Sequence, residues 1–294
     1  MEKIKNVTKR NLINTIKESN KGNIVICNNY SFLSDYNIDK NFTSKVGKNF
    51  SVLNFKEPEY SARFNPFSNF SSNIEIINFS KRIINFISSD GESDTLAQAT
   101  ILSALMLYLF KYRPKEEQNF TSIMKLLHVA KVDENNSNVK SPLDRIFDEI
   151  EKRDPGSIAF KQYQIRYLLN GTEFNFHISR LYSYFSIFNE KSVGDFSNHQ
   201  NIDFRNIFSG EENLIIILPD NDSNFAYIKE MFILCFKERY NSYCLETLKY
   251  PILNFFMDKK IKQKNIQEIL DDFLFMNANY FSISDALKDG GDFK

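Results

Sequence analysis

The sequence predicts an α/β fold in which an all-α helical domain is inserted into a strand-bearing core. Residues 213–219 form an apolar run of strand length that stops at Pro219, and Asp220 and Asp222 follow it. Such a run is typical of a buried parallel strand that delivers polar groups to the carboxyl edge of its sheet, where α/β folds bind ligands. Further along the chain the apolar residues recur with helical spacing instead. The expected domains are a core at residues 1–72 and 191–294 and an insertion at residues 73–190.

Short apolar runs bounded by polar residues predict the strands of the core. They lie at residues 23–27, 50–55, 213–219, 250–257 and 280–283. Helices are expected in the core at residues 35–48, 222–243 and 264–275. Two prolines within residues 57–67 restrict the residues before them, so this segment is expected to follow an extended path. Strands that alternate with helices in this way are the pattern of a parallel sheet.

The inserted domain is expected to consist of helices with recognisable start signals. Ser93 or Asp94 is expected to cap the most apolar helix, which ends near Tyr112. Ser141-Pro142 and Asp154-Pro155 each place a proline at a first helical position, where its missing N–H costs nothing. Helices are expected at residues 73–88, 94–112 and 121–131, from residue 142, at residues 155–170 and at residues 173–189.

The charge balance and the cysteines exclude several protein classes. The 37 basic and 37 acidic residues cancel, so no net field attracts nucleic acid or an anionic membrane. The three cysteines have no Cys-x-x-Cys spacing, which favours a reducing compartment. The longest apolar stretch, Leu96 to Phe110, falls short of the about 20 residues that span a bilayer. No signal peptide is recognisable, so we expect a cytoplasmic protein without membrane contact.

Few residues of the sequence are candidates for a chemical site. His128, His177 and His199 share no ligand spacing, so we expect neither a metal nor a cofactor. Asp220 and Asp222 are suited to bind a cation or to act as a general acid and base, although capping of the following helix is the simpler interpretation. Four tyrosines are candidates for a recognition surface, namely Tyr163, Tyr167, Tyr182 and Tyr184. Packing in the core is the simpler interpretation of these residues.

A basic cluster near the carboxyl terminus is the remaining candidate. It consists of Lys259, Lys260, Lys262 and Lys264. Four cations within six residues are suited to contact the phosphates of a nucleic acid or an acidic protein partner. A charged loop after a strand has the same composition, so nucleic-acid binding is not the favoured interpretation.

Several segments, in order, resemble the coupling-protein family of type IV secretion, the membrane ATPases that bring DNA to a conjugation channel. Ser61-Ala-Arg-Phe-Asn-Pro66 is similar to the family's S-x-R-[YF]-N-P segment, and Ile217-Leu-Pro-Asp-Asn-Asp222 to its I-P-D-x-D element. The segments 117–127, 140–144 and 161–163 resemble parts of its all-α domain. This resemblance implies a reduced RecA-like sheet core with an inserted all-α helical domain.

The departures from the family pattern concern the nucleotide site. Family members carry an amino-terminal membrane anchor and a Walker A loop, and the nearest segment here, Val46-Gly-Lys-Asn49, lacks the first glycine and the hydroxyl residue. Cys27-Asn-Asn-Tyr-Ser31 stands where the family has D-P-K-G-E. Asp258 matches the metal-side acid of Walker B, but Lys259 replaces the catalytic glutamate, and an ammonium group cannot activate the attacking water. The chain therefore resembles a truncated, degenerate member that lacks Walker A.

Three functions are compatible with these residues. We expect a non-catalytic interaction protein of a mobile genetic element, derived from a coupling protein, that binds a conjugation component or, as an inhibitor, a host or defence factor. One alternative is a coupling-protein subunit of conjugative DNA transfer whose nucleotide site is completed in trans, against which Lys259 argues. The other alternative is a nucleic-acid-binding accessory protein that uses the basic cluster.

Overall fold

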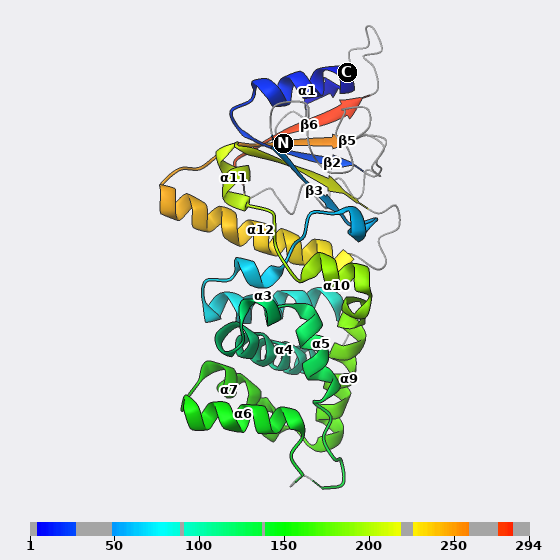
Figure 1. Ribbon diagram of the computed structural model, residues 1–294, viewed down its shortest axis with the longest axis vertical. Coiled ribbons are helices and arrows are strands. Elements are labelled where there is room, and N and C mark those ends of the chain that lie inside the picture. The colour runs from blue at the N-terminus through cyan, green and yellow to red at the C-terminus, as the bar shows by residue number, and fades with distance from the viewer. Residues whose placement is uncertain are drawn as a thin grey trace. The chain divides into compact units, whose positions relative to one another are not determined.

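The computed structural model describes residues 5–27, 49–88, 91–136, 139–218, 226–258 and 276–284 of the 294-residue chain (Figure 1). The chain divides into two compact units. The sheet unit comprises residues 1–62, 201–225 and 233–294, and the helical unit comprises residues 63–200 and 226–232.

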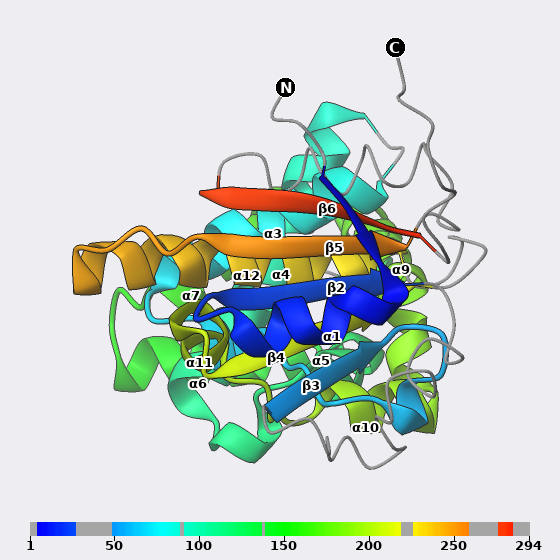
Figure 2. The same ribbon diagram turned by 90° about the horizontal axis from the view of Figure 1, so that it is seen from above.

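The sheet unit is built on six parallel strands. The strands are β1 (Lys5–Thr8), β2 (Gly22–Cys27), β3 (Asn49–Asn54), β4 (Glu212–Ile217), β5 (Leu253–Asp258) and β6 (Ala278–Ser284). Their order across the sheet is β1-β6-β5-β2-β4-β3, and every neighbouring pair is parallel (Figure 2). This arrangement confirms the predicted α/β fold with a parallel sheet.

The central strands are apolar because helices cover both faces of the sheet. Every residue of β2 and of β5 is buried. Helix α1 (Lys9–Glu18) lies on one face and α12 (Ala226–Thr247) on the other (Figures 1 and 2). Leu12 and Ile16 of α1 share a core with alternate residues of the strands, among them Val25 and Ile215. A strand buried on both faces has no side that needs polar residues, which explains the continuous apolar runs of the sequence.

Helix α11 (Phe204–Ser209) lies so close to the start of β2 that one position requires glycine. A Cβ atom on Gly22 would lie 2.0 Å from the backbone oxygen of Ile207. Gly210 ends α11 with φ +82°, the left-handed conformation in which glycine carries no steric penalty. Phe208 of α11 packs edge-to-face on Phe236 of α12, with ring centroids 5.0 Å apart. Two glycines and an aromatic pair therefore fix α11 against the sheet and α12.

A row of asparagines crosses the sheet near the amino ends of four neighbouring strands. Asn213, Asn23, Asn254 and Asn279 come from β4, β2, β5 and β6. Their side chains are joined one to the next by amide hydrogen bonds of 2.7, 2.9 and 2.9 Å. The first three residues are no more than 5% exposed. Because buried amides are costly unless they are hydrogen-bonded, the row favours a single register among these strands.

The helical unit consists of short helices packed around one long apolar helix. The helices are α3 (Asn73–Ile87), α4 (Glu92–Tyr112), α5 (Phe120–His128), α6 (Pro142–Arg153), α7 (Ile158–Tyr163), α8 (Ile165–Leu168), α9 (Gly171–Phe185) and α10 (Lys191–Ser197). Short 3-10 turns lie at Pro58–Tyr60, Pro66–Asn69, Lys115–Glu117 and Ser186–Asn189. Among the described residues, only Ser93–Tyr112 of α4 is long and apolar enough to cross a membrane, and most of this segment is buried in the fold. Burial of this kind is what the central helix of a packed domain requires.

Two predicted helix starts are wrong. Helix α4 begins after Gly91, without a side-chain cap, instead of after Ser93 or Asp94. The helix expected at Pro155 begins instead at Ile158 after Ser157, and it is interrupted at Gln164. The carboxylate of Asp154 accepts hydrogen bonds from Lys111 and Tyr112 on α4, so this group is used in a tertiary contact.

Other predictions are confirmed, incomplete or untested. Pro142 opens α6 as expected, with a capping box between Ser141 and Asp144. The elements β1, α1, α10 and α11 were not predicted. The helices expected at residues 35–48 and 264–275 lie outside the described residues.

Candidate functional site

The sequence predicts a candidate site at the carboxyl edge of the sheet. In the described residues, backbone hydrogen bonds join neighbouring strand ends at this edge. The N–H of Leu218 donates to the oxygen of Cys27 at 2.8 Å, and the N–H of Phe55 donates to the oxygen of Ile217 at 3.0 Å. The Asn54 side-chain oxygen accepts from two backbone N–H groups of the following turn, each at 3.0 Å. These polar groups at the ends of β2, β3 and β4 are therefore occupied by hydrogen bonds within the sheet unit.

Of the candidates at the nucleotide positions and in the basic cluster, only one lies in the described part of the chain. Asp258 ends β5 and is 6% exposed. The other candidates, Asp220, Asp222, Lys259, Lys260, Lys262 and Lys264, lie outside the described residues. In the parts of the chain that the structure describes, no three His, Cys, Asp or Glu side chains lie close enough together to hold a metal ion.

One polar cluster in the helical unit contains residue types that serve in catalysis elsewhere. Asp154 Oδ2 accepts hydrogen bonds from Lys111 Nζ at 2.6 Å and from the Tyr112 hydroxyl, which also contacts Ser157 Oγ at 2.6 Å. The hydrogen bond to Asp154 raises the pKa of Lys111, and the bond from Lys111 lowers the pKa of Asp154. Burial raises the pKa of Tyr112. These directions keep an ammonium, a carboxylate and a neutral phenol, whereas a general base requires a pKa near the working pH. The cluster joins α4 to the α6–α7 turn.

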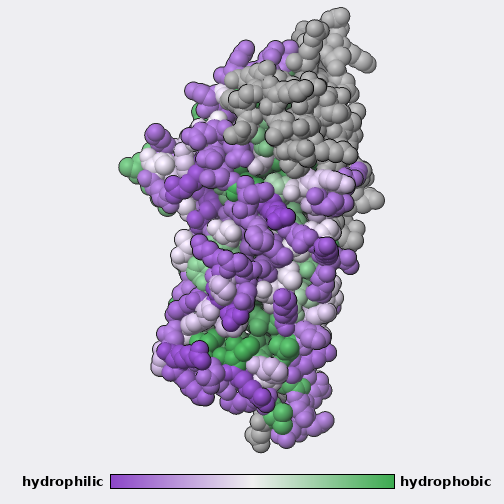
Figure 3. All heavy atoms as spheres, viewed as in Figure 1, coloured by the Kyte–Doolittle hydropathy of each residue, from purple (hydrophilic) through white to green (hydrophobic). Residues whose placement is uncertain are grey.

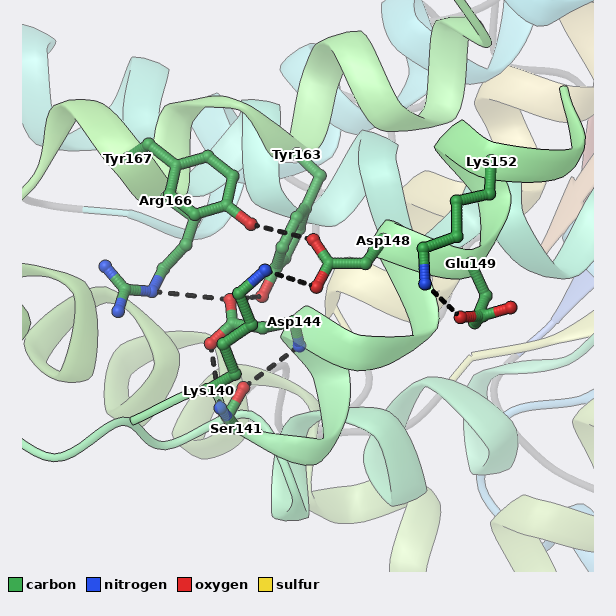
Figure 4. Close-up of polar contacts among 9 residues, drawn as sticks. All are labelled: Lys140, Ser141, Asp144, Asp148, Glu149, Lys152, Tyr163, Arg166 and Tyr167. Atoms are coloured by element: carbon green, nitrogen blue, oxygen red, sulfur yellow. Dashed lines mark hydrogen bonds and ion pairs between the residues drawn. The ribbon is translucent and has the colours of Figure 1, made fainter. Parts of the chain in front are cut away.

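A second polar cluster, centred on Asp144 of α6, is buried (Figure 4). Asp144 Oδ2 accepts from the backbone N–H of Ser141 at 2.8 Å, which closes the capping box of α6. Asp144 Oδ1 accepts from the Tyr163 hydroxyl at 2.8 Å and lies 3.6 Å from Arg166 Nε. The three side chains Asp144, Tyr163 and Arg166 are 1%, 0% and 6% exposed. One carboxylate therefore connects the start of α6 to both α7 and α8.

Aromatic rings complete the buried cluster. Tyr163 stacks on Phe147 with ring centroids 3.9 Å apart and an interplanar angle of 6°. The Arg166 guanidinium lies 5.0 Å from the centre of the Phe174 ring, within the range of a cation–π interaction. Burial, followed by the Asp144 charge, raises the pKa of Tyr163 well above its ordinary value, so its hydroxyl stays protonated and donates to Asp144. The cluster is thus a buried support in which a hydrogen bond, an ion pair and ring packing join α6 to α7, α8 and α9.

The support holds two exposed residues at its outer surface. Tyr167 and Leu168, the two residues after Arg166, are 50% and 80% exposed. The Tyr167 hydroxyl lies 3.4 Å from Asp148 Oδ1, and Asp148 also forms an ion pair with Lys140 at 2.5 Å (Figure 4). Burial raises the pKa of Tyr167 to about 12, so the ring is uncharged at neutral pH. Tyrosine is one of the residue types enriched at the centres of protein interfaces, and Tyr167 is exposed on a support of buried side chains.

The sequence identified part of this cluster but not its arrangement. Of the aromatics proposed for a recognition surface, Tyr167 and Tyr182 are exposed, whereas Tyr163 is fully buried. Segments 140–144 and 161–163 are separate in the sequence, and the structure brings them together through the hydrogen bond from Tyr163 to Asp144. The capping-box spacing from Ser141 to Asp144 identified the helix start. No signal in the sequence indicated that the same carboxylate also binds Arg166.

The comparisons with known proteins show a distant similarity to solved structures. No protein-family model and no curated protein sequence matches the chain. Among solved structures, the chain is similar to a bacterial conjugative coupling protein, TrwBdeltaN70 in its unbound monoclinic form, with 11% identity and a TM-score of 0.45. The match covers 90% of this chain and 56% of that protein, so this chain spans little more than half of the other's length.

Proposed function

We propose that this chain is a non-catalytic interaction protein of a mobile genetic element, derived from a conjugation coupling protein, that binds a protein partner. The observation that carries the proposal is the exposed pair Tyr167 and Leu168 above the buried Asp144 cluster. Exposing a large apolar side chain gives up about 1.5–3 kcal/mol of burial energy. A helix of four residues that is held by a buried ion pair, and that still leaves its leucine in solvent, is suited to binding.

We infer the absence of catalysis from the residues that align with the nucleotide-binding motifs of the coupling-protein family. Lys259 stands where the family has its catalytic glutamate, and Val46-Gly-Lys-Asn49 lacks the glycine and the hydroxyl of a phosphate loop. The polar cluster of Lys111, Tyr112 and Asp154 has its pKa values shifted away from neutrality, in the directions of a structural ion pair. These features support a binding role over turnover of ATP.

Two measurements on the full chain test the proposal. Calorimetry with ATP and Mg²⁺ is expected to show no heat of binding, and binding in the micromolar range would contradict a non-catalytic role. Affinity capture from the source cell is expected to enrich a protein with the wild-type chain but not with the double variant Tyr167→Ser, Leu168→Ser. The matched control is Leu245→Ser, which changes a leucine that is 76% exposed on α12.

The captured protein decides between the two kinds of partner. A component of the conjugation machinery indicates a role in transfer, and a host or defence protein indicates an inhibitor. If the double variant captures the same proteins as the wild type, the surface at Tyr167 and Leu168 is not the binding site.

A further inference from the structure

The helical segment α7–α8 has two different faces. Gln164 lies between the two short helices with φ −57° and ψ −18°, so the backbone stays in the right-handed helical region across the interruption. Its inner face carries Ala159, Tyr163 and Arg166, which are all buried. The opposite face carries Ile158, Lys161, Ile165 and Leu168, of which Ile158 is 40% and Leu168 is 80% exposed.

The spacing of the outer face is that of a helix-packing seam. Its four residues, which we call the α7–α8 seam, are separated by three, four and three positions. This is the alternation of the a and d positions along a coiled-coil helix, whose side chains insert between those of a facing helix. At 1.5 Å per residue the seam is about 16 Å long, enough for about three turns of a partner helix. Figure 3 shows hydrophobic residues gathered on the surface of the helical unit around α4 and α7.

The seam is fixed before any partner arrives. Tyr163 and Arg166, on its inner side, both contact the Asp144 carboxylate. Ser103 of α4 donates to the side-chain oxygen of Gln162 at 3.1 Å, which holds α7 from another direction. A surface whose backbone is already ordered gives up less conformational entropy on binding than a flexible one.

The one charge in the seam indicates the chemistry of the partner. Lys161 is exposed and forms no ion pair with any residue in the described ranges. Its neighbours Gln162 and Gln164 are uncharged. A facing apolar helix would bury this ammonium group without compensation, which is costly. A facing helix with a carboxylate at the matching position would pair it.

A second copy of this chain does not meet this requirement. In an antiparallel pairing of two seams, each Lys161 would face Ile165 of the other copy, and in a parallel pairing the two Lys161 side chains would face each other. Both arrangements leave a lysine without a carboxylate in the seam. A nucleic acid is also a poor fit, because one cation among three apolar residues cannot neutralise several phosphates.

We propose that the α7–α8 seam binds a short amphipathic helix of another protein, in which an acidic residue faces Lys161 and apolar residues face Ile158, Ile165 and Leu168. The inference rests on the proposed function and adds the place and chemistry of the contact. An amphipathic helix presents its apolar anchors at intervals of three and four residues, which match the spacing of the seam.

Photo-crosslinking from the full chain locates the contact. A benzophenone amino acid replaces Gln164, which is exposed beside the seam, and in a matched control it replaces Asn241, which is exposed on α12. The expected result is a protein adduct at position 164 only, mapped to a segment with apolar residues spaced three and four apart and an acidic residue among them. A protein adduct only at position 241 overturns the seam but not the proposed function. Protein adducts at neither position count against both, and so does an adduct to nucleic acid alone.

A synthetic peptide with the sequence of the crosslinked segment then tests the chemistry. Leu168→Ser is expected to weaken its binding to the full chain about tenfold or more, the loss that one buried leucine brings. Lys161→Glu is expected to weaken binding as well, and a peptide whose acidic residue is changed to lysine is expected to restore it. Because both positions are exposed, thermal unfolding of the variants should match the wild type. If the charge swap does not restore binding, Lys161 does not face a carboxylate and the inference is wrong.

Discussion

Asn23 of β2 donates a hydrogen bond from Nδ2 to Oδ1 of Asn213 in β4 at 2.7 Å, and both residues are 0% exposed. The Asn23 oxygen in turn accepts from Asn254 of β5 at 2.9 Å. Asn23 therefore joins the two halves of the asparagine row, one on each side of β2. Because side chains alternate between faces along a strand, a shift of one residue in register would bring apolar side chains against these amides.

The first prediction concerns this residue. Asn23→Ala is expected to lower the free energy of unfolding by about 1–3 kcal/mol, because it removes the buried hydrogen bonds that Asn23 forms with Asn213 and Asn254. Urea unfolding followed by circular dichroism measures the change. Asn241→Ala, at an exposed position of α12, is the control and should stay within about 0.5 kcal/mol of the wild type. Equal effects at the two positions would show that the asparagine row does not stabilise the sheet.

The second prediction concerns the buried pair of Asp144 and Arg166. Removing either partner by Asp144→Ala or Arg166→Ala is expected to cost about 3–5 kcal/mol, because the remaining charge has no counter-ion in a buried site. The double variant should lose about 0.5–3 kcal/mol less than the sum of the two single changes. The surface pair of Glu149 and Lys152, joined at 2.8 Å on the same helix, is the control cycle, and no measurable coupling is expected there. Additive losses at Asp144 and Arg166 would be evidence against a working ion pair.

The sequence was sufficient for the elements that carry their own apolar signal. The strands β2 and β4 are runs of buried β-branched and aliphatic residues, which only a doubly covered strand requires. Strand β1, by contrast, is an edge strand that pairs only with β6, and its segment Lys5–Thr8 has a single aliphatic residue. Helices α10 and α11 have seven and six residues, too short for a clear helical period. Such elements form because of the tertiary contacts around them.

The candidate site was less accessible for the same reason. The spacing of Ser141 and Asp144 identified a helix start, but Tyr163 and Arg166 reach the same carboxylate only because α6, α7 and α8 pack together. Asp154 precedes a proline, as a residue that caps a helix often does. In the structure its side chain binds Lys111 and Tyr112 of α4 instead. An aspartate can bond either to nearby backbone N–H groups or to distant side chains, and only the three-dimensional structure shows which of these it does.

The third prediction is a pH dependence at the amino end of β4. Burial raises the pKa of Glu212, and the hydrogen bond from Ser51 lowers it. The effect of burial is the larger of the two, so the pKa is raised. A carboxyl group with a raised pKa in the folded state stabilises the fold at acid pH, and this contribution is lost as the pH rises through that pKa. Glu212→Gln keeps an acceptor for Ser51 and removes the titration. The variant should therefore be more stable than the wild type at pH 7, and the difference should shrink toward pH 4.

Urea unfolding of both proteins between pH 4 and pH 8 measures the difference. The control is Glu211→Gln, which removes one negative charge at the exposed neighbouring position. A variant that is less stable than the wild type at pH 7 would mean that the Glu212 carboxylate is favourably paired in the folded protein.

The last prediction concerns the close approach of α11 to the sheet. A methyl group on Gly22 would lie 2.0 Å from the Ile207 backbone oxygen and 2.9 Å from a methyl carbon of Leu253. The backbone oxygen cannot rotate away, so α11 must shift, and overpacking of this kind costs about 1–3 kcal/mol or more. Gly22→Ala should therefore lower the midpoint of thermal unfolding, whereas Gly91→Ala should lower it less, because a methyl group at Gly91 has no neighbour within 4 Å and only the N-cap preference of glycine is lost. Equal midpoints for the two variants would mean that α11 moves away from β2 without cost, and that Gly22 is not needed for their packing.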